Sequence, residues 1–425
     1  MVERAQPTSR AGFRHGLAPS RRVPLPPWWY RALTGALEPW SARWGQEQDP
    51  AAIAARRGRA LPPADTWIHA ASVGEAAGVA PLVAEWRARR PDDGILLSAL
   101  TPGGRRALAR DLPAHFVTAP PVESLGAARR ALAPRSVRRL VLLETEIWPA
   151  WLAAALERDV RIAVANARLS DRAWRRYRRW ASLFRPYLAR FTAVAAQDAL
   201  DAERWTALGV PAGRVRVTGN TKFDRSPACA PLADADRRTA RRALGLDPGG
   251  VWCVFGSLRP GEERWVAAAL AAGAPHNLRA LVVPRHPDLW GDPRRRVGEG
   301  GPAVWLRQLG VLPQAYRAAD FAVVGGTLEA YGGHNPVEPA ALGLPVILGS
   351  SLENCRAAAT ALRTAGGALT VADPGELAAA AARWAADPVA RAAAAAAAWR
   401  AAASLAGAAA RTLDWFGESG LWAPE

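Results

Sequence analysis

The stretch Trp67-Ile-His-Ala-Ala-Ser-Val-Gly-Glu75 carries the pattern that decides the fold. Its apolar start predicts a buried strand at Thr66–Ala70, and the small residues after it predict a turn into a helix near Glu75. Outward from this stretch, short apolar runs alternate with amphipathic Ala/Arg/Leu segments. This alternation predicts βαβ units in a mostly parallel sheet. Further strands are predicted at Gly94–Leu100, Arg139–Leu143, Arg161–Ala165 and Thr192–Ala196.

A second series of strands follows a segment that contains Pro227 and Pro231. We therefore expect an α/β chain with two Rossmann-like, doubly wound domains that face a cleft, as in GT-B-type glycosyltransferases, epimerases and phosphorylases. The second series is predicted at Val251–Gly256, Leu278–Pro284, Phe321–Gly325 and Pro345–Gly349. The expected divisions are a disordered Arg/Pro-rich tail with a Trp-rich segment (1–44), a first domain (45–224), a linker (225–245) and a second domain with terminal helices (246–425).

The formal net charge of +17 favours anionic partners. Nucleic acid, an anionic membrane surface and an anionic substrate would each fit, but the Arg residues are dispersed and no nucleic-acid-binding motif accompanies them. We therefore expect no nucleic-acid partner. The cysteines at 229, 253 and 355 lie far apart without metal-ligand spacing, so neither a disulfide framework nor a metal site is expected.

The first 26 residues are rich in Arg and Pro and have no apolar core, which argues against a signal peptide. No run of about 18 apolar residues predicts a membrane span. Near-helical spacing nevertheless relates Trp29, Leu33, Leu37, Trp40 and Trp44. Trp beside Arg suits a membrane interface, and a helix that simply packs on the first domain explains the spacing equally well.

Lys222 is the only lysine among 55 basic residues, and it lies within Thr218-Gly-Asn-Thr-Lys-Phe-Asp224. A single surface lysine could remain by chance in an Arg-rich sequence. A compact ammonium differs from a planar guanidinium, however, so we predict a functional role for Lys222. Three of the five asparagines, Asn166, Asn220 and Asn335, also fall within the motifs singled out here, although asparagine commonly closes turns.

Two glutamates follow predicted strands of the first domain. Glu75 could simply favour a helix N-terminus, or it could face the cleft as a general base beside Gly74. Leu143-Glu-Thr-Glu-Ile-Trp-Pro149 places Glu144 just after a very apolar run. Glu144 could cap the next helix, which Pro149 helps to start, or it could face the same cleft as Glu75.

In the second half, Arg285 follows a predicted strand within Val283-Pro-Arg-His-Pro287, and its forked guanidinium suits a phosphate. The glycines of Tyr331-Gly-Gly-His-Asn-Pro-Val-Glu-Pro339 would let the backbone approach a phosphate. Glu338 could accept hydrogen bonds from ribose hydroxyls. Together these residues predict a nucleotide site.

These motifs resemble those of the 3-deoxy-D-manno-octulosonic acid (Kdo) transferase family, in the same order and over roughly residues 45–410. The matching stretches are Ile68–Glu75, Thr101–Gly104, Glu144–Pro149, Asn166–Ser170, Thr218–Asp224, Pro284–Pro287 and Gly332–Pro339. The resemblance implies an inverting, metal-independent transfer of Kdo from a cytidine-monophosphate donor (CMP-Kdo) to a lipid A precursor, without a cofactor. It places the acceptor in the first domain, the donor in the second, and the protein at the cytoplasmic face of the Gram-negative inner membrane.

The resemblance also implies roles for individual residues. Glu75 would be the catalytic base, and Glu144 and Lys222 would stabilise the transition state. The nucleotide contacts would be Pro284, Arg285, Leu309, Gly310, Val311, Asn335, Pro336, Val337 and Glu338. A two-domain transferase with another nucleotide-sugar donor and a non-catalytic protein that binds anionic lipid are the alternative interpretations.

Overall fold

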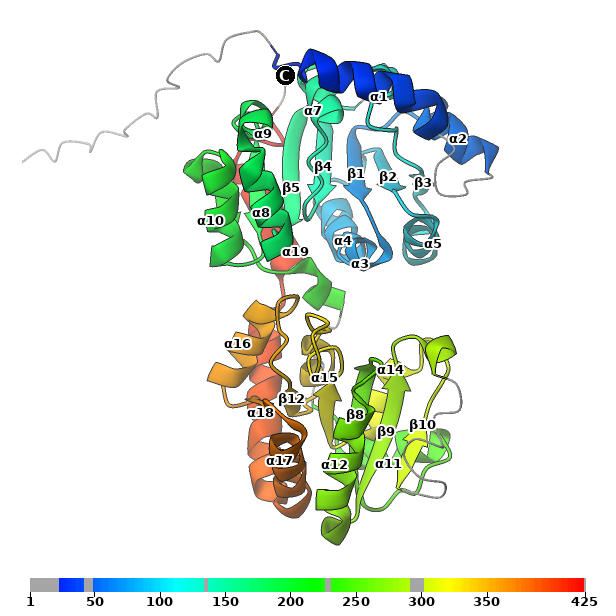
Figure 1. Cartoon of the computed structure of the whole chain (residues 1–425), viewed down its shortest axis with the longest axis vertical. Helices are drawn as coiled ribbons and strands as arrows, with labels where there is room; N and C mark the ends of the chain where they lie inside the picture. The colour runs from blue at the N-terminus through cyan, green and yellow to red at the C-terminus, as the bar shows by residue number, and fades with distance from the viewer. Residues whose placement is uncertain (1–22, 42–48, 134–136, 226–230, 291–301, 424–425) are drawn as a thin grey trace, which may run out of the picture.

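The computed structural model describes residues 23–41, 49–133, 137–225, 231–290 and 302–423. Two α/β domains lie end to end, and in each a parallel sheet is covered by helices on both faces (Figure 1). The predicted fold class is thereby confirmed: the chain has two Rossmann-like domains in the GT-B arrangement. Cys229, Pro227 and Trp44 lie outside the described residues.

The first sheet has seven parallel strands in the order β3-β2-β1-β4-β5-β6-β7. Strand order reverses between β1 and β4, and such a switch point leaves a crevice at the carboxyl ends of the two strands. The strands are β1 (Thr66–Ala70), β2 (Ile95–Ala99), β3 (Phe116–Thr118), β4 (Arg139–Leu143), β5 (Arg161–Ala167), β6 (Ala193–Ala196) and β7 (Val215–Val217).

Two helices of the first domain precede β1, and its other helices follow the strands along the chain. They are α1 (Trp28–Ser41), α2 (Pro50–Arg56), α3 (Val73–Ala76), α4 (Val79–Arg89), α5 (Pro102–Asp111), α6 (Leu125–Ala131), α7 (Pro149–Leu156), α8 (Asp171–Arg179), α9 (Ala181–Leu188) and α10 (Ala199–Leu208), with the 3-10 turns η1 (Ala212–Arg214) and η2 (Thr221–Arg225).

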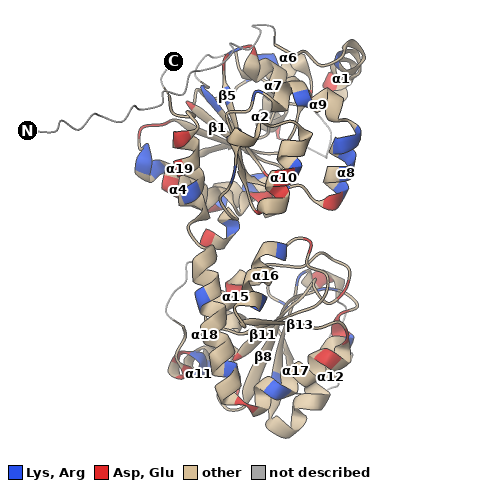
Figure 2. Cartoon of the chain, turned by 90° about the vertical axis from the view of Figure 1, so that its left-hand side faces the viewer, with Lys and Arg blue, Asp and Glu red and all other residues tan. Residues whose placement is uncertain are grey.

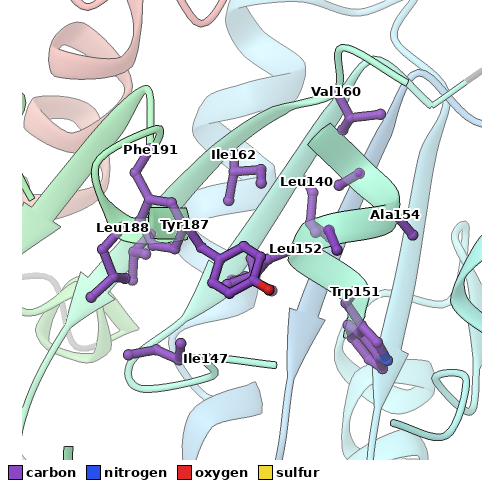
Figure 3. Packing of buried hydrophobic residues seen from close by; sticks show 14 of the residues in the cluster. Leu140, Ile147, Trp151, Leu152, Ala154, Val160, Ile162, Tyr187, Leu188 and Phe191 are labelled. Carbon is purple, nitrogen blue, oxygen red and sulfur yellow. The ribbon is translucent and has the colours of Figure 1, made fainter. Parts of the chain in front are cut away.

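The buried faces of α7 and α9 pack on β4 and β5 (Figure 3). Leu152 of α7 and Leu188 of α9 are fully buried beside Ile162 of β5, and Trp151 lies at the end of this layer. Burying a Leu or Ile side chain contributes about 1.5–3 kcal/mol relative to leaving it exposed, so this layer stabilises the edge of the sheet from which Glu144 projects.

The second sheet has six parallel strands in the order β10-β9-β8-β11-β12-β13, with its switch point between β8 and β11. The strands are β8 (Val251–Leu258), β9 (Leu278–Pro284), β10 (Ala303–Trp305), β11 (Phe321–Val324), β12 (Val346–Leu348) and β13 (Ala368–Thr370). The helical elements are α11 (Asp234–Ala243), α12 (Glu263–Gly273), η3 (Ala274–His276), η4 (Pro287–Leu289), α14 (Leu312–Ala318), α15 (Val337–Ala341), α16 (Arg356–Thr364), α17 (Pro374–Ala386) and α18 (Pro388–Leu405).

The last helix, α19 (Ala408–Glu418), returns to the first domain (Figure 1). Leu413 and Phe416 belong to the core cluster that contains Ile68 and Val141, so the predicted second domain of 246–425 extends too far at its C-terminal end. The Asp224 carboxylate accepts hydrogen bonds from the first amides of α19, at 2.7 Å for Gly407. The chain passes between the domains twice, once after Asp224 and once just before α19, and these hydrogen bonds hold the two segments together.

The predicted linker of 225–245 also contains more structure than expected. Within it, α11 packs against α14 of the second domain. Arg241 of α11 is buried, donates to Ala318 O at 2.8 Å and pairs with Asp320 at 2.7 Å. These contacts make α11 a part of the second domain rather than of a linker.

Helix α1 lies on the first domain with its polar side inward. Tyr30 donates to Glu123 at 2.9 Å, and Glu38 accepts from Ser124 at 2.5 Å and pairs with Arg130. The opposite side is apolar and exposed: Trp28 and Trp40 are 75% and 79% accessible, and Trp29, Leu33 and Leu37 are also exposed. We call these five residues the apolar stripe. The helix therefore packs on the first domain, as one of the two sequence interpretations predicts, and association of its uncovered apolar side with a membrane stays a prediction.

Candidate functional site

Glu75 lies in the short helix α3, directly after β1 and at the switch point of the first sheet. Its Oε2 accepts a hydrogen bond from the backbone N–H of Ala71 at 2.6 Å, and Ser72 Oγ lies 3.4 Å from Oε1. Burial, followed by the charges of Glu144 and Glu146, raises the pKa of Glu75 to about 8, although the Ala71 amide and Lys222 oppose the shift. A carboxyl group with such a pKa exchanges protons near neutral pH, as a general base requires.

Glu144 follows β4, across the switch point from Glu75. Its φ of +56° lies in the left-handed region, which non-glycine residues enter only where the surrounding structure enforces it. Lys222 Nζ lies 2.5 Å from Glu144 Oε1, in a pair whose side chains are 27% and 12% accessible. The sole lysine is therefore held by a carboxylate at the carboxyl end of the central strand β4.

A network of amide side chains holds the turn that carries Lys222. Asn166 Oδ1 accepts from the Thr221 N–H and Asn220 Oδ1 accepts from the Lys222 N–H, both at 3.0 Å. Gln197 Oε1 accepts a hydrogen bond from Asn220 Nδ2 at 3.1 Å, and Gln197 Nε2 donates to Asn166 O at 3.0 Å. Two of the three asparagines singled out in the sequence, Asn166 and Asn220, thus position the lysine backbone.

A cavity of about 600 Å³ lies between the two domains. Gly74, Lys222 and Asn220 line it from the first domain, and Arg285, Asn335 and Glu338 line it from the second. Arg110 and Arg225 add positive charge at the same cavity. A volume in this range is typical of small-molecule sites, and the basic lining suits an anionic ligand.

Asn335 and Glu338 are linked at the start of α15. Asn335 Nδ2 donates to Glu338 Oε1 at 3.3 Å, and Asn335 Oδ1 accepts from the Val337 N–H at 3.0 Å. Burial raises the pKa of Glu338, while Asn335, Arg225 and Arg285 act in the opposite direction. Glu338 therefore has an acceptor oxygen close to the guanidinium groups of the cavity.

The remaining predicted nucleotide residues lie around this cavity rather than in its lining. Pro284, Pro336 and Val337 are buried. Leu309 is 80% exposed and precedes α14 together with Gly310 and Val311, whereas it is Leu312 and Tyr316 of α14 that line the cavity.

Sequence reasoning did not single out Arg168, Gln197 or Tyr316, all of which line the interdomain cavity. Arg168 could have been predicted, because it lies two residues after Asn166 in one of the motifs that match the family. Tyr316 carries no local signal. The Tyr316 hydroxyl occupies the space that a side chain at position 256 would need, since a Cβ on Gly256 would lie 2.4 Å from the Tyr316 hydroxyl oxygen. This glycine lets the end of β8 pack against the cavity wall.

A second cavity of about 580 Å³ is lined by Glu144. Its lining includes Arg168, Arg176, Tyr177 and Trp148. Arg168 lines both cavities and joins the domains, because it donates to Asn354 Oδ1 at 2.7 Å and to Glu353 O at 3.1 Å. We call this second space the headgroup cavity. Arg168 therefore lies in the wall that the two cavities share, and Glu144 lines the headgroup cavity.

Basic residues continue from the headgroup cavity onto α8, whose residues 172, 175, 178 and 179 are exposed arginines. Helix α8 lies on the same side of the first domain as α1 (Figure 2), and Tyr30 of α1 lines the headgroup cavity together with Arg176 of α8. Within the described ranges, no helix is both long and apolar enough to cross a bilayer. In the same part of the chain, no group of three or more His, Cys, Asp or Glu side chains is arranged to hold a metal ion.

Comparison with solved structures shows the fold. The UDP-GlcNAc 2-epimerase of Neisseria meningitidis, bound to UDP-GlcNAc, matches 83% of this chain and 99% of its own with a TM-score of 0.59 and 14% identity. The Anabaena protein HepE, in complex with UDP and glucose, matches 84% of this chain and 99% of its own with a TM-score of 0.60 and 15% identity. At these identities the likeness establishes the two-domain architecture alone.

Sequence comparison establishes the family. A family model described as 3-deoxy-D-manno-octulosonic-acid transferase (kdotransferase) matches residues 38–225. The 3-deoxy-D-manno-octulosonic acid transferase of Bordetella pertussis is 32% identical over 430 residues, which cover 92% of this chain and 96% of that protein. The Haemophilus influenzae protein of the same name is 30% identical over 315 residues, covering 69% and 72%. The chain therefore belongs to the 3-deoxy-D-manno-octulosonic acid transferase family and is a glycosyltransferase.

Proposed function

We propose that the protein transfers Kdo from CMP-Kdo to a lipid A precursor in lipopolysaccharide biosynthesis, with inversion at the anomeric carbon and without a metal ion. The observation that carries the proposal is the convergence of Glu75, Glu144 and Lys222 at the switch point of one domain. This point adjoins a basic cavity that Arg285 and Glu338 of the other domain also line. Family membership supplies the sugar that is transferred.

Glu75 is the general base in this proposal. It takes the proton of an acceptor hydroxyl, and the hydroxyl oxygen forms a bond to the anomeric carbon of Kdo on the face opposite the phosphate. The bond from that carbon to the phosphate oxygen breaks, and CMP leaves with the electron pair. A phosphate leaving group needs little protonation, so a single carboxylate base suffices. The raised pKa of Glu75, about 8, suits a group that both takes and releases this proton.

Positive charge at the cavity stabilises the departing nucleotide. Lys222, Arg225 and Arg285 line the space in which the phosphate would lie, and Glu144 fixes the ammonium of Lys222. A preorganised charged donor that meets developing charge contributes about 3–4 kcal/mol to transition-state stabilisation. Asn335 and Glu338 offer hydrogen-bond partners for the ribose, and Pro284, Leu309, Gly310, Val311, Pro336 and Val337 would complete the nucleotide contacts.

The headgroup cavity receives the phosphorylated sugar of the acceptor in this proposal. Arg168 and Arg176 line it beside Glu144, and guanidinium groups bind phosphate through paired hydrogen bonds. The apolar stripe of α1 and the arginines of α8 would rest on the anionic cytoplasmic face of the inner membrane. Exposed Trp and Leu insert into the interfacial region, and arginines are attracted to anionic lipid.

Incubation with CMP-Kdo and tetraacylated lipid A precursor, read by mass spectrometry, tests the proposal. We expect a product heavier by one or more Kdo units. Glu75→Gln should lower the rate by about 10²–10⁴-fold, the usual contribution of a general base, while the affinity for cytidine nucleotide stays unchanged. Glu203→Gln, which changes an exposed carboxylate on α10 of the first domain, serves as the control. A parent protein that transfers no sugar from CMP-Kdo would refute the proposed function.

A further inference from the structure

A third cavity, of about 460 Å³, adjoins the headgroup cavity on the opposite side of Trp148. Its lining is mostly apolar and includes Leu100, Pro120, Pro121, Val122, Trp148 and Trp151. Leu100 follows β2, and Trp148 and Trp151 belong to the start of α7, so the cavity lies at the carboxyl ends of the same strands as the site. We call it the apolar cavity. Its lining suits a hydrocarbon rather than a sugar or a nucleotide.

Buried polar atoms in the walls require an oxygen on that ligand. Trp151 Nε1 and His69 Nε2 have no hydrogen-bond partner among the described residues, although both residues line the apolar cavity. Ser98 Oγ lies 2.9 Å from His69 Nδ1, and Glu146 Oε2 lies 3.9 Å from His69 Nε2, so both imidazole nitrogens have polar neighbours. The indole Nε1 of Trp151 can only donate, so it is the buried group that an oxygen of the ligand would satisfy.

The apolar cavity also lies close to α1, the helix that carries the apolar stripe. Tyr30 on the inner side of α1 donates to Glu123, which lines the apolar cavity, and Tyr30 itself lines the headgroup cavity. The apolar stripe lies on the outer side of the same helix. A lipid whose phosphorylated sugar occupies the headgroup cavity therefore has an apolar space within reach, beside the helix that faces the bilayer.

Resting on the proposed function, we infer that the apolar cavity binds one fatty acyl chain of the acceptor lipid. The chain buries its methylene groups against the proline and tryptophan side chains, and its carbonyl or hydroxyl oxygen accepts a hydrogen bond from Trp151 Nε1. The enzyme thereby recognises an acylated acceptor and fixes the sugar hydroxyl relative to Glu75. Acyl recognition within the domain distinguishes this lipid from the bulk phospholipid that contacts the apolar stripe.

Filling the cavity tests the inference. Val122→Trp places a large side chain in the apolar cavity, and Val389→Trp, at a residue 78% exposed on the second domain, is the matched control. Each variant is assayed with CMP-Kdo and two acceptors: the tetraacylated precursor and the same phosphorylated disaccharide with its acyl chains removed. We expect Val122→Trp to raise KM for the acylated acceptor about tenfold or more, the effect of two methylene groups left unburied, and to leave KM for the deacylated acceptor unchanged.

Each other outcome overturns the inference. Equal losses with both acceptors mean that Val122→Trp disturbs the catalytic site, and no loss with either means that the chain binds elsewhere. If Val122→Trp melts below the assay temperature, Val122→Phe replaces it under the same criteria. A binding measurement separates this inference from the proposed function: if the parent transfers no Kdo yet retains radiolabelled tetraacylated precursor more strongly than Val122→Trp, the proposed function fails and the acyl site stands. Equal retention by the two proteins refutes the acyl site.

Discussion

Replacing Lys222 tests whether the sole lysine serves catalysis. In Lys222→Arg the positive charge is kept, but the turn that carries it is fixed by Asn166 and Asn220 and leaves Nζ only 2.5 Å from Glu144. A guanidinium is longer and planar, so it meets Glu144 with a different geometry and no longer directs a point charge into the interdomain cavity. The substitution therefore separates the shape of the cation from its charge.

The expected magnitudes follow from the position of this pair. Losing one charged donor to the transition state costs about 3–4 kcal/mol, so Lys222→Ala should lower kcat about 10²–10³-fold. Lys222→Arg should recover part of this and fall about 10-fold or more below the parent. Folding should change little in the Arg variant because the pair with Glu144 persists. In the Ala variant the loss should lie between about 1 kcal/mol for a surface pair and about 3 kcal/mol for a buried one.

Steady-state rates with CMP-Kdo and the acylated acceptor, together with thermal melts, measure both effects. Arg59→Lys is the matched control, since it makes an Arg/Lys exchange at an exposed side chain of the same domain. Its rate and melting temperature should equal those of the parent. A Lys222→Arg enzyme with parental kcat would refute the reasoning, because the lysine would then be exchangeable with the residue that the protein uses everywhere else.

Three further predictions concern the base, the membrane surface and the last helix. The pKa of Glu75 is raised to about 8, so the deprotonated fraction of this carboxyl group increases up to that pH, and kcat/KM should rise with pH and level off above pH 8. Glu75→Gln should also melt at a higher temperature than the parent at pH 8, because burial of the carboxylate opposes folding. A flat pH profile would contradict this assignment. Replacing Trp28, Trp29 and Trp40 by Ser should reduce co-sedimentation with anionic vesicles and leave nucleotide affinity intact, whereas undiminished sedimentation would place the attachment elsewhere. Phe416→Ala should destabilise the first domain by about 3–5 kcal/mol in urea unfolding, and a loss under about 1 kcal/mol would show that α19 does not contribute to that core.

The central strands could be predicted from the sequence, and the edge strands could not. All nine predicted strands occur, because each central strand is a continuous buried apolar run. The strands that were missed are β3, β7, β10 and β13, which lie at the sheet edges and have three residues each. Phe116 and Val217 on these strands are about half exposed, so the apolar pattern there is too short and too mixed to stand out.

Some residues of the candidate site could also be predicted from the sequence, and others could not. Glu75, Glu144 and Lys222 lie in local motifs that end strands or form turns, and the structure brings them together. Arg168, Gln197 and Tyr316 reach the cavity through the packing of one element on another, which local patterns do not encode. The position of α19 is also non-local, because its apolar residues would equally suit a helix packed on the second domain.

The return of α19 determines the order in which the two domains can be completed during synthesis. Residues 231–405, which build the second sheet and its helices, leave the ribosome before Leu413 and Phe416, which close the core around β1 and β4. Domains usually fold from the N-terminus as the chain emerges. Here the N-terminal domain keeps an open apolar face until α19 has been synthesised, so the C-terminal domain is the first to finish. A chain released after residue 405 would carry one complete domain and one that quality-control proteases can recognise.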